Sequence, residues 1–230
     1  MLVEWVAMTM AASTKDTTAL SDAELVEMAD LCVDREPRFD IGFLSKQREE
    51  WVLVTTVREG HKLRGYSFCT LERIGGTPSL LVGVGLVERN SKSDQSLKCL
   101  LGDQFRRALL AFPDEDVLLG LRLLSADGYR AFGGLLDVVP RTDHRPTGEE
   151  RAWARRLAKR FGNEKGLDDR TFVLSYDANP VGGLDYTVSK APIPEGADEL
   201  FRAVKPNRGQ RLVAFGWAMA EELAKGKLTK

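Results

Sequence analysis

The residues with the clearest chemical potential lie near the middle of the sequence, where an apolar run ends in a carboxylate. Glu88 follows the run from Leu80 to Val87, and Lys92 lies four residues later in a polar turn. Glu88 could accept a proton as a general base, or it could be an ordinary solvated carboxylate at a strand end. Lys92, or Lys98 further on, could supply positive charge for a bound anion. The stretch therefore combines a candidate base with a candidate anion site.

The elements around this stretch are predicted to be a buried strand, a turn and a long helix. A near-continuous apolar run is typical of a strand covered on both faces, which we place at residues 79–88. Ser93 is expected to cap the next helix, whose apolar residues recur at helical spacing up to a proline. The first amides of a helix lack partners within the helix, and its dipole favours negative charge there. A phosphate could therefore bind to the amides of Asp94, Gln95 and Ser96.

The flanking patterns predict a mixed fold. Ser21 with Glu24, and Thr147 with Glu150, have the spacing of capping boxes and predict helices over residues 20–34 and 147–161. Short turns between apolar runs predict an antiparallel meander, and the strand after the long helix is expected to run parallel to the one before it. In chain order we expect a frayed tail (1–19), a helix (20–34), a loop with a short helix (35–49), strands (51–57, 64–73, 79–88), the long helix, a strand (117–124), a short helix (125–136), a strand (137–140), a helix (147–161), a strand (171–176), a loop (177–196) and a final helix (210–225).

Composition restricts the class of protein. The 230 residues, 43% of them hydrophobic, can bury a substantial core, and the net charge of -1 gives no general attraction to nucleic acid or acidic membranes. Three widely spaced cysteines without a paired motif are typical of reduced thiols in a cytoplasmic protein. The apolar start is too short to span a bilayer, so we expect no membrane partner. Two histidines without a ligand cluster predict no protein-bound metal, and the glycines at 83 and 85 lie inside a strand, which disfavours a dinucleotide site.

The order of elements resembles that of the GNAT family of acyl-CoA-dependent N-acetyltransferases. Two stretches carry the likeness: LLVGVGLVERNSKSDQSLKCLL, similar to the family's central strand, diphosphate loop and helix, and SADGYRAFGGLLDVVPR, similar to a later family segment. The resemblance covers roughly residues 20–140 and implies an α/β (α+β) fold with a mixed, mostly antiparallel, twisted sheet flanked by helices. Residues 141–230 would form an α/β C-terminal extension packed on this domain. The resemblance also implies acetyl-CoA, or another acyl-CoA, as cosubstrate.

The resemblance assigns roles to particular residues. Glu88 would be the first candidate for the base, and Tyr129 could stand in for the family's tyrosine, the acid that protonates the departing thiolate. The family splays its strands near the end of the central strand, which would free backbone amides there for the thioester. The residues expected to contact the cosubstrate are Leu86, Val87, Lys92, Asp94, Gln95, Ser96, Ser125 and Phe132.

The sequence departs from the family pattern in both stretches, and in the second Leu136 and Asp137 replace the family's Gly-aromatic pair. Gln95 and Leu97 stand where the family has glycines that let backbone amides approach the diphosphate. Phe132 stands at the position of the family's tyrosine and cannot donate a proton; Tyr129, nearly one helical turn away, could substitute or could simply pack.

Two function classes therefore stay open. One is an acyltransferase that acts on an amine of a small molecule or peptide, and the other is a catalytically inactive GNAT-like module that binds a ligand or protein through the same cleft. Nucleic acid is not the expected partner, because glutamates dilute the arginines of helix 147–161. Phe215 and Trp217 could cover a neighbouring subunit, which would make a homodimer.

Overall fold

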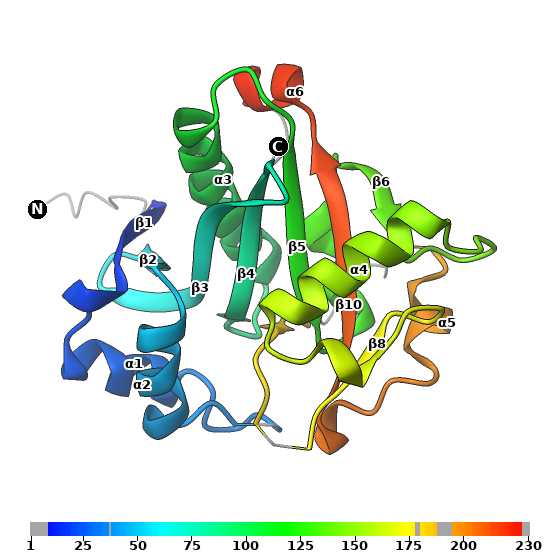
Figure 1. Cartoon of the computed structure of the whole chain (residues 1–230). Coiled ribbons are helices and arrows are strands. Elements are labelled where there is room, and N and C mark those ends of the chain that lie inside the picture. The colour runs from blue at the N-terminus through cyan, green and yellow to red at the C-terminus, as the bar shows by residue number, and fades with distance from the viewer. Residues whose placement is uncertain (1–8, 37, 178–179, 188–194, 227–230) are drawn as a thin grey trace, which may run out of the picture.

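The computed structural model describes residues 9–36, 38–177, 180–187 and 195–226. One ten-stranded sheet runs through the whole molecule in the order β1-β2-β3-β4-β9-β5-β10-β8-β7, and β6 pairs with β10 (Figure 1). This confirms the predicted mixed, mostly antiparallel sheet flanked by helices. The strands are β1 (Met10–Asp16), β2 (Leu53–Glu59), β3 (Lys62–Ile74), β4 (Thr77–Val87), β5 (Val117–Leu123), β6 (Leu136–Val139), β7 (Leu167–Asp168), β8 (Val173–Ser175), β9 (Leu184–Asp185) and β10 (Gln210–Ala218).

Strands β2, β3 and β4 form the predicted antiparallel meander. The turn between β3 and β4 uses Gly75 and Gly76 at φ values of +59° and +89°, a conformation that side chains disfavour. Residues of β4 are buried almost along its whole length, as the apolar run predicts. Turn glycines and an apolar strand, both visible in the local sequence, therefore account for this half of the sheet.

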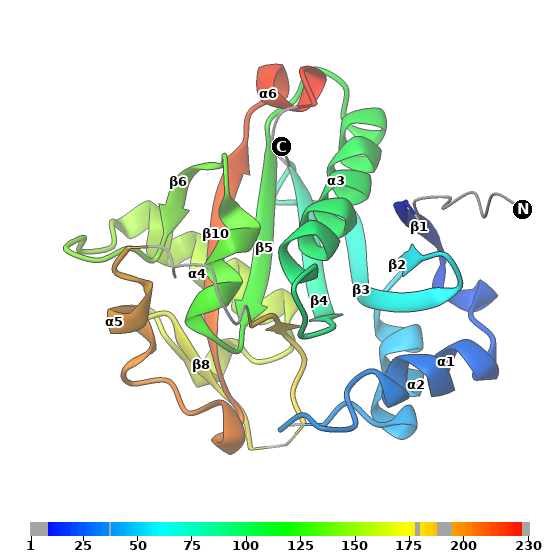
Figure 2. The same ribbon diagram turned by 180° about the vertical axis from the view of Figure 1, so that it is seen from behind.

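Helices cover both faces of the sheet. α3 (Ser93–Ala111) packs across β1 to β4 on one face, and α4 (Gly148–Arg160) lies on the other face over β5 and β10 (Figures 1 and 2). Both predicted capping boxes form, at Ser21 with Glu24 and at Thr147 with Glu150. The remaining helices are η1 (Thr17–Ala19), α1 (Asp22–Asp30), α2 (Ile41–Glu50), η2 (Ala126–Phe132), η3 (Glu164–Gly166), α5 (Ala197–Phe201), η4 (Pro206–Arg208) and α6 (Ala220–Ala224). In the part of the chain described here, no helix is both long and apolar enough to cross a bilayer.

Several expectations about local structure were wrong. Residues 10–16 are not part of a frayed tail but form β1, which pairs with β2. Residues 210–225 form not one helix but β10 followed by the short α6; β10 is covered on both faces, so its apolar residues show no alternation that would distinguish a strand from a helix. Ser93 is the first residue of α3 rather than its cap, and its hydroxyl accepts a hydrogen bond from the Asn90 amide at 2.9 Å.

The predicted division at residue 140 stays a prediction. Strands β8 and β10, which follow that point, continue the same sheet. Phe215 and Trp217 of β10 pack within their own chain, against Phe172 and Trp153 at ring-centroid distances of 6.3 Å and 5.8 Å.

Candidate functional site

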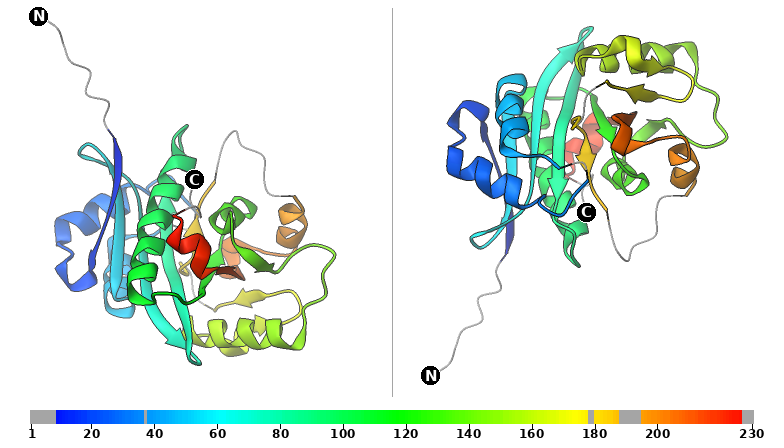
Figure 3. Two further views of the ribbon diagram at one scale, coloured as in Figure 1. Left: turned by 90° about the horizontal axis from the view of Figure 1, so that it is seen from above. Right: turned by 90° about the horizontal axis from the view of Figure 1, so that it is seen from below.

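The two central parallel strands pair directly at one end only. Residues Ser79–Val82 of β4 lie opposite Leu118–Leu121 of β5. Beyond these residues β9 lies between the two strands, parallel to both, with Leu184 opposite Gly85 on one side and Leu123 on the other. We call this space between the diverging strands the wedge, and residues 180–187, which occupy it, the strap (gold in Figures 2 and 3).

The narrow part of the wedge admits a chain without side chains. A Cβ atom on Gly182 would lie 2.5 Å from Arg122 Nη2 and 2.7 Å from the Gly83 carbonyl oxygen. A Cβ on Gly85 would lie 2.9 Å from Leu184 Cδ1. These separations are shorter than van der Waals contact, so the strap passes here because Gly182 carries no side chain.

Backbone hydrogen bonds hold the strap as a strand of the sheet. The Gly85 amide donates to the Gly183 carbonyl at 3.0 Å, and the Leu124 amide donates to the Leu184 carbonyl at 3.3 Å. Ser125 Oγ donates to the Tyr186 carbonyl at 2.6 Å. The backbone groups that the wedge exposes are therefore bonded to the protein's own chain.

Buried arginines surround the strap. Arg35 Nη1 lies 2.8 Å from Asp185 Oδ1, and the exposed fractions of these side chains are 5% and 7%. Arg211, which is fully buried, donates from Nη2 to the Val181 carbonyl at 2.8 Å. Burial, followed by repulsion from Arg122, lowers the pKa of Arg211 to about 10. Burial likewise lowers the pKa of Arg35, against the opposing effect of Asp185.

The strand order and the wedge together decide the fold. An antiparallel meander leads into a central strand, a helix crosses over to a parallel strand, and the two parallel strands then diverge. The fold is GNAT-like.

Comparison with solved structures finds matches that include acetyltransferases. The chain is similar to aminoglycoside 6'-acetyltransferase type Ii, with 14% identity and a TM-score of 0.42 over 57% of this chain and 88% of that one. It is similar to Escherichia coli ElaA, with 18% identity and a TM-score of 0.39 over 61% and 95%. It is also similar to yncA, a putative acetyltransferase from Salmonella typhimurium solved with its cofactor acetyl-CoA, with 12% identity and a TM-score of 0.37 over 92% and 95%. The sequence matches no protein-family model and no curated protein. All three TM-scores lie below 0.5.

The predicted diphosphate turn of the GNAT-like fold lies at the open end of the wedge. Lys92, at the N-cap position of α3, makes no side-chain cap and forms an ion pair with Glu59 instead. Asp94 pairs with Arg130 at 2.9 Å, and Gln95 is exposed. Ser96 is buried, and both its amide, at 2.9 Å, and its Oγ, at 3.1 Å, donate to the Lys92 carbonyl, so the prediction that the Ser96 amide is open to a phosphate was wrong for this conformation.

Of four further predicted cosubstrate residues, two contact the strap directly. Leu86 lies opposite Asp185, and the Val87 carbonyl accepts a hydrogen bond from Arg35 at 2.6 Å. Ser125 bonds the strap at Tyr186, and Phe132 packs in the core beside Tyr129. Leu86 and Ser125 thus contact the strap in this structure, and the cosubstrate roles of all four residues stay predictions.

The two predicted catalytic side chains are both engaged. Glu88 Oε1 lies 2.8 Å from Lys62 Nζ, and Oε2 contacts Arg64 and accepts from Asn90 Nδ2 at 2.6 Å. Burial raises the pKa of Glu88, but these ion pairs outweigh burial and hold that pKa below its usual value. Tyr129 donates to the Pro140 carbonyl at 2.9 Å, and burial raises its pKa far above the ordinary value.

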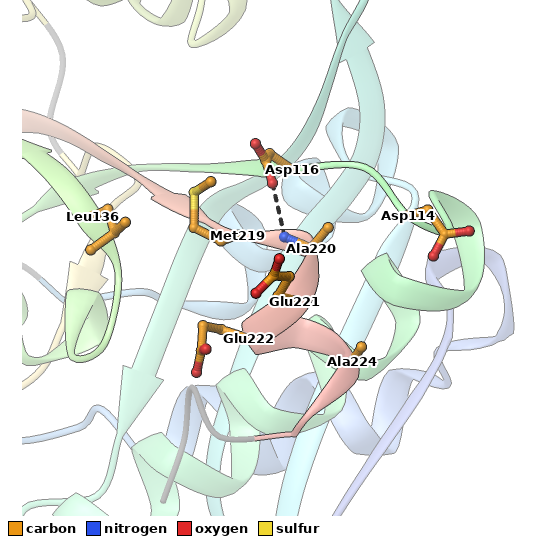
Figure 4. A pocket seen from close by; sticks show the side chains of 8 residues that line it. All are labelled: Asp114, Asp116, Leu136, Met219, Ala220, Glu221, Glu222 and Ala224. Atoms are coloured by element: carbon orange, nitrogen blue, oxygen red, sulfur yellow. Dashed lines mark hydrogen bonds between the residues drawn. The ribbon is translucent and has the colours of Figure 1, made fainter.

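Two further regions carry side chains that could bind a partner. A cavity of about 720 Å³ lies beside α6, at the opposite end of β5 from the strap (Figure 4). It is lined by Asp114, Asp116, Leu136, Met219, Ala220, Glu221, Glu222 and Ala224. Among the described residues, no group of three or more potential ligands has the arrangement of a metal site.

The arginines of α4 form the second region. Arg155 pairs with Asp169, Arg160 donates to Glu72 at 2.6 Å, and Arg156 lies over the Trp153 ring.

Sequence reasoning missed the residues that close the wedge. Arg35 and Arg211 are isolated in the sequence, and Asp185 lies in a stretch rich in glycine and proline that was expected to be a loop. The one available signal was the pair Gly182 and Gly183 followed by a leucine, which is compatible with a short strand at a site of close backbone approach.

Proposed function

We propose that this protein is an acyltransferase that moves an acyl group from acyl-CoA to an amine of a small molecule or peptide. The observation that carries the proposal is the wedge itself. Its walls already hydrogen-bond an extended chain that has amide groups and, at the narrow point, no side chains.

The pantetheine arm of coenzyme A fits that description chemically. It is an extended chain with two amides, and it is unbranched between the second amide and the sulfur. The Gly85 amide, which now donates to the Gly183 carbonyl at 3.0 Å, is a donor that a pantetheine or thioester carbonyl could use. The strap occupies the place that we propose for the pantetheine arm, and its backbone makes the hydrogen bonds that the arm would make.

The start of α3 supplies the matching site for the diphosphate. No side chain caps this helix, so the N–H groups of Asp94 and Gln95 can donate to a phosphate at the positive end of the helix dipole. Lys92 can turn from Glu59 to a phosphate, because its side chain is half exposed. The missing glycines limit how closely the backbone can approach the phosphate.

Glu88 is our candidate base. Its contact with Lys62 Nζ at 2.8 Å is the contact that a substrate ammonium would make before it loses a proton. For transfer, the incoming ammonium has to replace Lys62 and the pKa of Glu88 has to rise, as desolvation by a bound substrate would cause. Tyr129 is our candidate acid, which would require its hydroxyl to leave the Pro140 carbonyl.

Calorimetry tests the proposal. In the strap variant, a glycine and serine segment of equal length replaces residues 181–186. We expect acetyl-CoA to bind this variant with micromolar affinity, a binding free energy of about -8 kcal/mol. The full chain should bind at least tenfold more weakly, because only molecules with the strap displaced can bind. Lys92→Glu in the strap variant should weaken binding. A folded strap variant that binds neither acetyl-CoA nor CoA would exclude the proposal.

The second candidate is a GNAT-like module without catalysis. Two observations favour it. Glu88 and Tyr129 are both engaged in ion pairs or hydrogen bonds within the protein. Gln95 and Leu97 stand where the family's loop has glycines. The strap variant separates the two candidates. Binding of acetyl-CoA with acyl transfer to any amine of a screening panel, lost in Glu88→Gln, identifies the enzyme; binding without transfer identifies the module.

A further inference from the structure

Arg35 is a buried cation in the wall of the wedge. It follows α1 in the chain and reaches β4 and the strap together, with Nη2 donating to the Val87 carbonyl at 2.6 Å and Nη1 2.8 Å from Asp185 Oδ1. Arg89 Nη2 lies 3.4 Å from the same Asp185 oxygen and is half exposed. Two guanidinium groups therefore converge on one carboxylate of the strap.

Asp185 is the only acidic residue of the strap, whose sequence is PVGGLDYT. Every other contact described above between the strap and the wedge uses backbone atoms of the strap, at Val181, Gly183, Leu184 and Tyr186. The strap thus presents to the wedge an extended backbone and one anionic group.

The burial of Arg35 makes that anionic group necessary. Removing a guanidinium from water is costly unless an anion and hydrogen-bond acceptors replace the solvent. Without Asp185, Arg35 would retain the Val87 carbonyl as its acceptor and no opposite charge within ion-pair distance among the described residues. Any chain that takes the place of the strap is therefore expected to bring an anion to this point.

We propose that Arg35 is the receptor for an anionic oxygen group of the ligand of the wedge, and that Asp185 occupies this receptor when the strap is in place. This inference rests on the proposed function, because it concerns the same groove. The ligand's anion is either a phosphate of coenzyme A or a carboxylate on the amine acceptor, and ligand binding exchanges that group for Asp185 and displaces the strap.

The two partners of this ion pair should respond to substitution in opposite directions. Asp185→Asn preserves the shape of the side chain but removes its charge, so the strap is held less tightly and acetyl-CoA should bind about tenfold more tightly than to the full wild-type chain. Arg35→Gln also releases the strap but removes the receptor. If the receptor takes a phosphate, acetyl-CoA should bind this variant about tenfold more weakly than wild type; if it takes a carboxylate of the acceptor, glutamate should bind about tenfold more weakly.

A matched ion pair provides the control. Asp103 and Arg107 lie 3.2 Å apart on α3, away from the strap, and the side chain of Asp103 is largely buried while that of Arg107 is partly buried. Asp103→Asn and Arg107→Gln should therefore leave the affinity unchanged. Circular dichroism confirms folding of each variant. If Arg35→Gln does not fold, Arg35→Lys replaces it, and the expected weakening is smaller but in the same direction.

The inference is overturned if Arg35→Gln weakens the binding of neither acetyl-CoA nor glutamate, since Arg35 would then only fasten the strap, or if neither substitution changes the affinity for either ligand. Failure of the proposed function gives a different result. In that case neither acetyl-CoA nor S-acetylpantetheine binds any variant, whereas deuterium uptake by residues 181–187 still rises in Asp185→Asn and not in Asp103→Asn.

Two ligands distinguish the sources of the anion. If the anion is a phosphate, acetyl-CoA should increase deuterium uptake by residues 181–187, and S-acetylpantetheine, which lacks the nucleotide phosphates, should not. If the anion is a carboxylate of the acceptor, S-acetylpantetheine should displace the strap only when glutamate is added as a carboxylate-bearing amine. If none of these combinations displaces the strap at saturating thioester, the proposed exchange is contradicted.

Discussion

The two ends of the β4–β5 pair differ in what lies between the strands. At the amino ends, Leu80 and Leu119 are direct neighbours in a fully buried, apolar contact. At the carboxyl ends the strap separates the strands, glycines keep the passage narrow, and buried arginines line it. One end is thus ordinary hydrophobic core, and the other has the polar donors and charges of a binding site that its own chain fills.

The largest effect on stability is expected at the closed end. Leu119 is fully buried, so Leu119→Ala removes apolar contacts and leaves a cavity, and we expect the free energy of unfolding to fall by about 2 to 5 kcal/mol. Chemical denaturation measures this loss. Leu110→Ala is the matched control, because Leu110 is 71% exposed and its truncation should change stability by less than about 0.5 kcal/mol. Equal effects of the two substitutions would contradict the description of this end as core.

A smaller effect is expected at the narrow point of the wedge. Gly182→Ala introduces a Cβ atom 2.7 Å from the Gly83 carbonyl oxygen, and such overpacking costs about 1 to 3 kcal/mol. The strap should respond before the rest of the fold, which hydrogen exchange of residues 181–187 would show. Gly148→Ala serves as the control because a Cβ there meets no atom within 4 Å. A Gly182→Ala protein with unchanged stability and exchange would show that the passage is wider than described.

The smallest effect is expected from one hydrogen bond at the far end of the strap. Ser125→Ala removes the donor to the Tyr186 carbonyl and should cost about 0.5 to 1.5 kcal/mol. The loss should appear as faster exchange in residues 184–187, with little change in β1 to β3. The exposed Ser91 provides the control substitution Ser91→Ala. Faster exchange throughout the sheet would indicate that the strap and the core unfold as one unit.

The contrast between the two ends also explains which features the sequence could predict. The meander, α3 and both capping boxes depend on residues close in the chain, so turn glycines, a serine and a threonine with glutamates three residues later, and helical spacing were sufficient. The strap depends on partners that lie about 60 residues away at Leu123 and about 100 residues away at Gly85. No local pattern encodes such a pairing, and β10 was misassigned because burial on both faces removes the period of two.

The site shows the same division. The sequence placed Glu88, Lys92 and Asp94 at one strand end because they follow one another along the chain. It gave no means to place Arg35 beside Asp185, since each lies in a segment without a regular pattern and only the tertiary fold joins them. The roles of Glu88 and Tyr129 in catalysis stay predictions.

The central claim is that the wedge is a ligand groove and that the strap is its internal occupant. Hydrogen exchange of the full chain, with and without saturating acetyl-CoA, tests it most directly. We expect uptake by residues 181–187 to rise on ligand addition, while residues 83–87 of β4 stay protected because the ligand replaces the strap as their hydrogen-bond partner. Binding that leaves uptake by residues 181–187 unchanged would show that the ligand binds elsewhere and would contradict the claim.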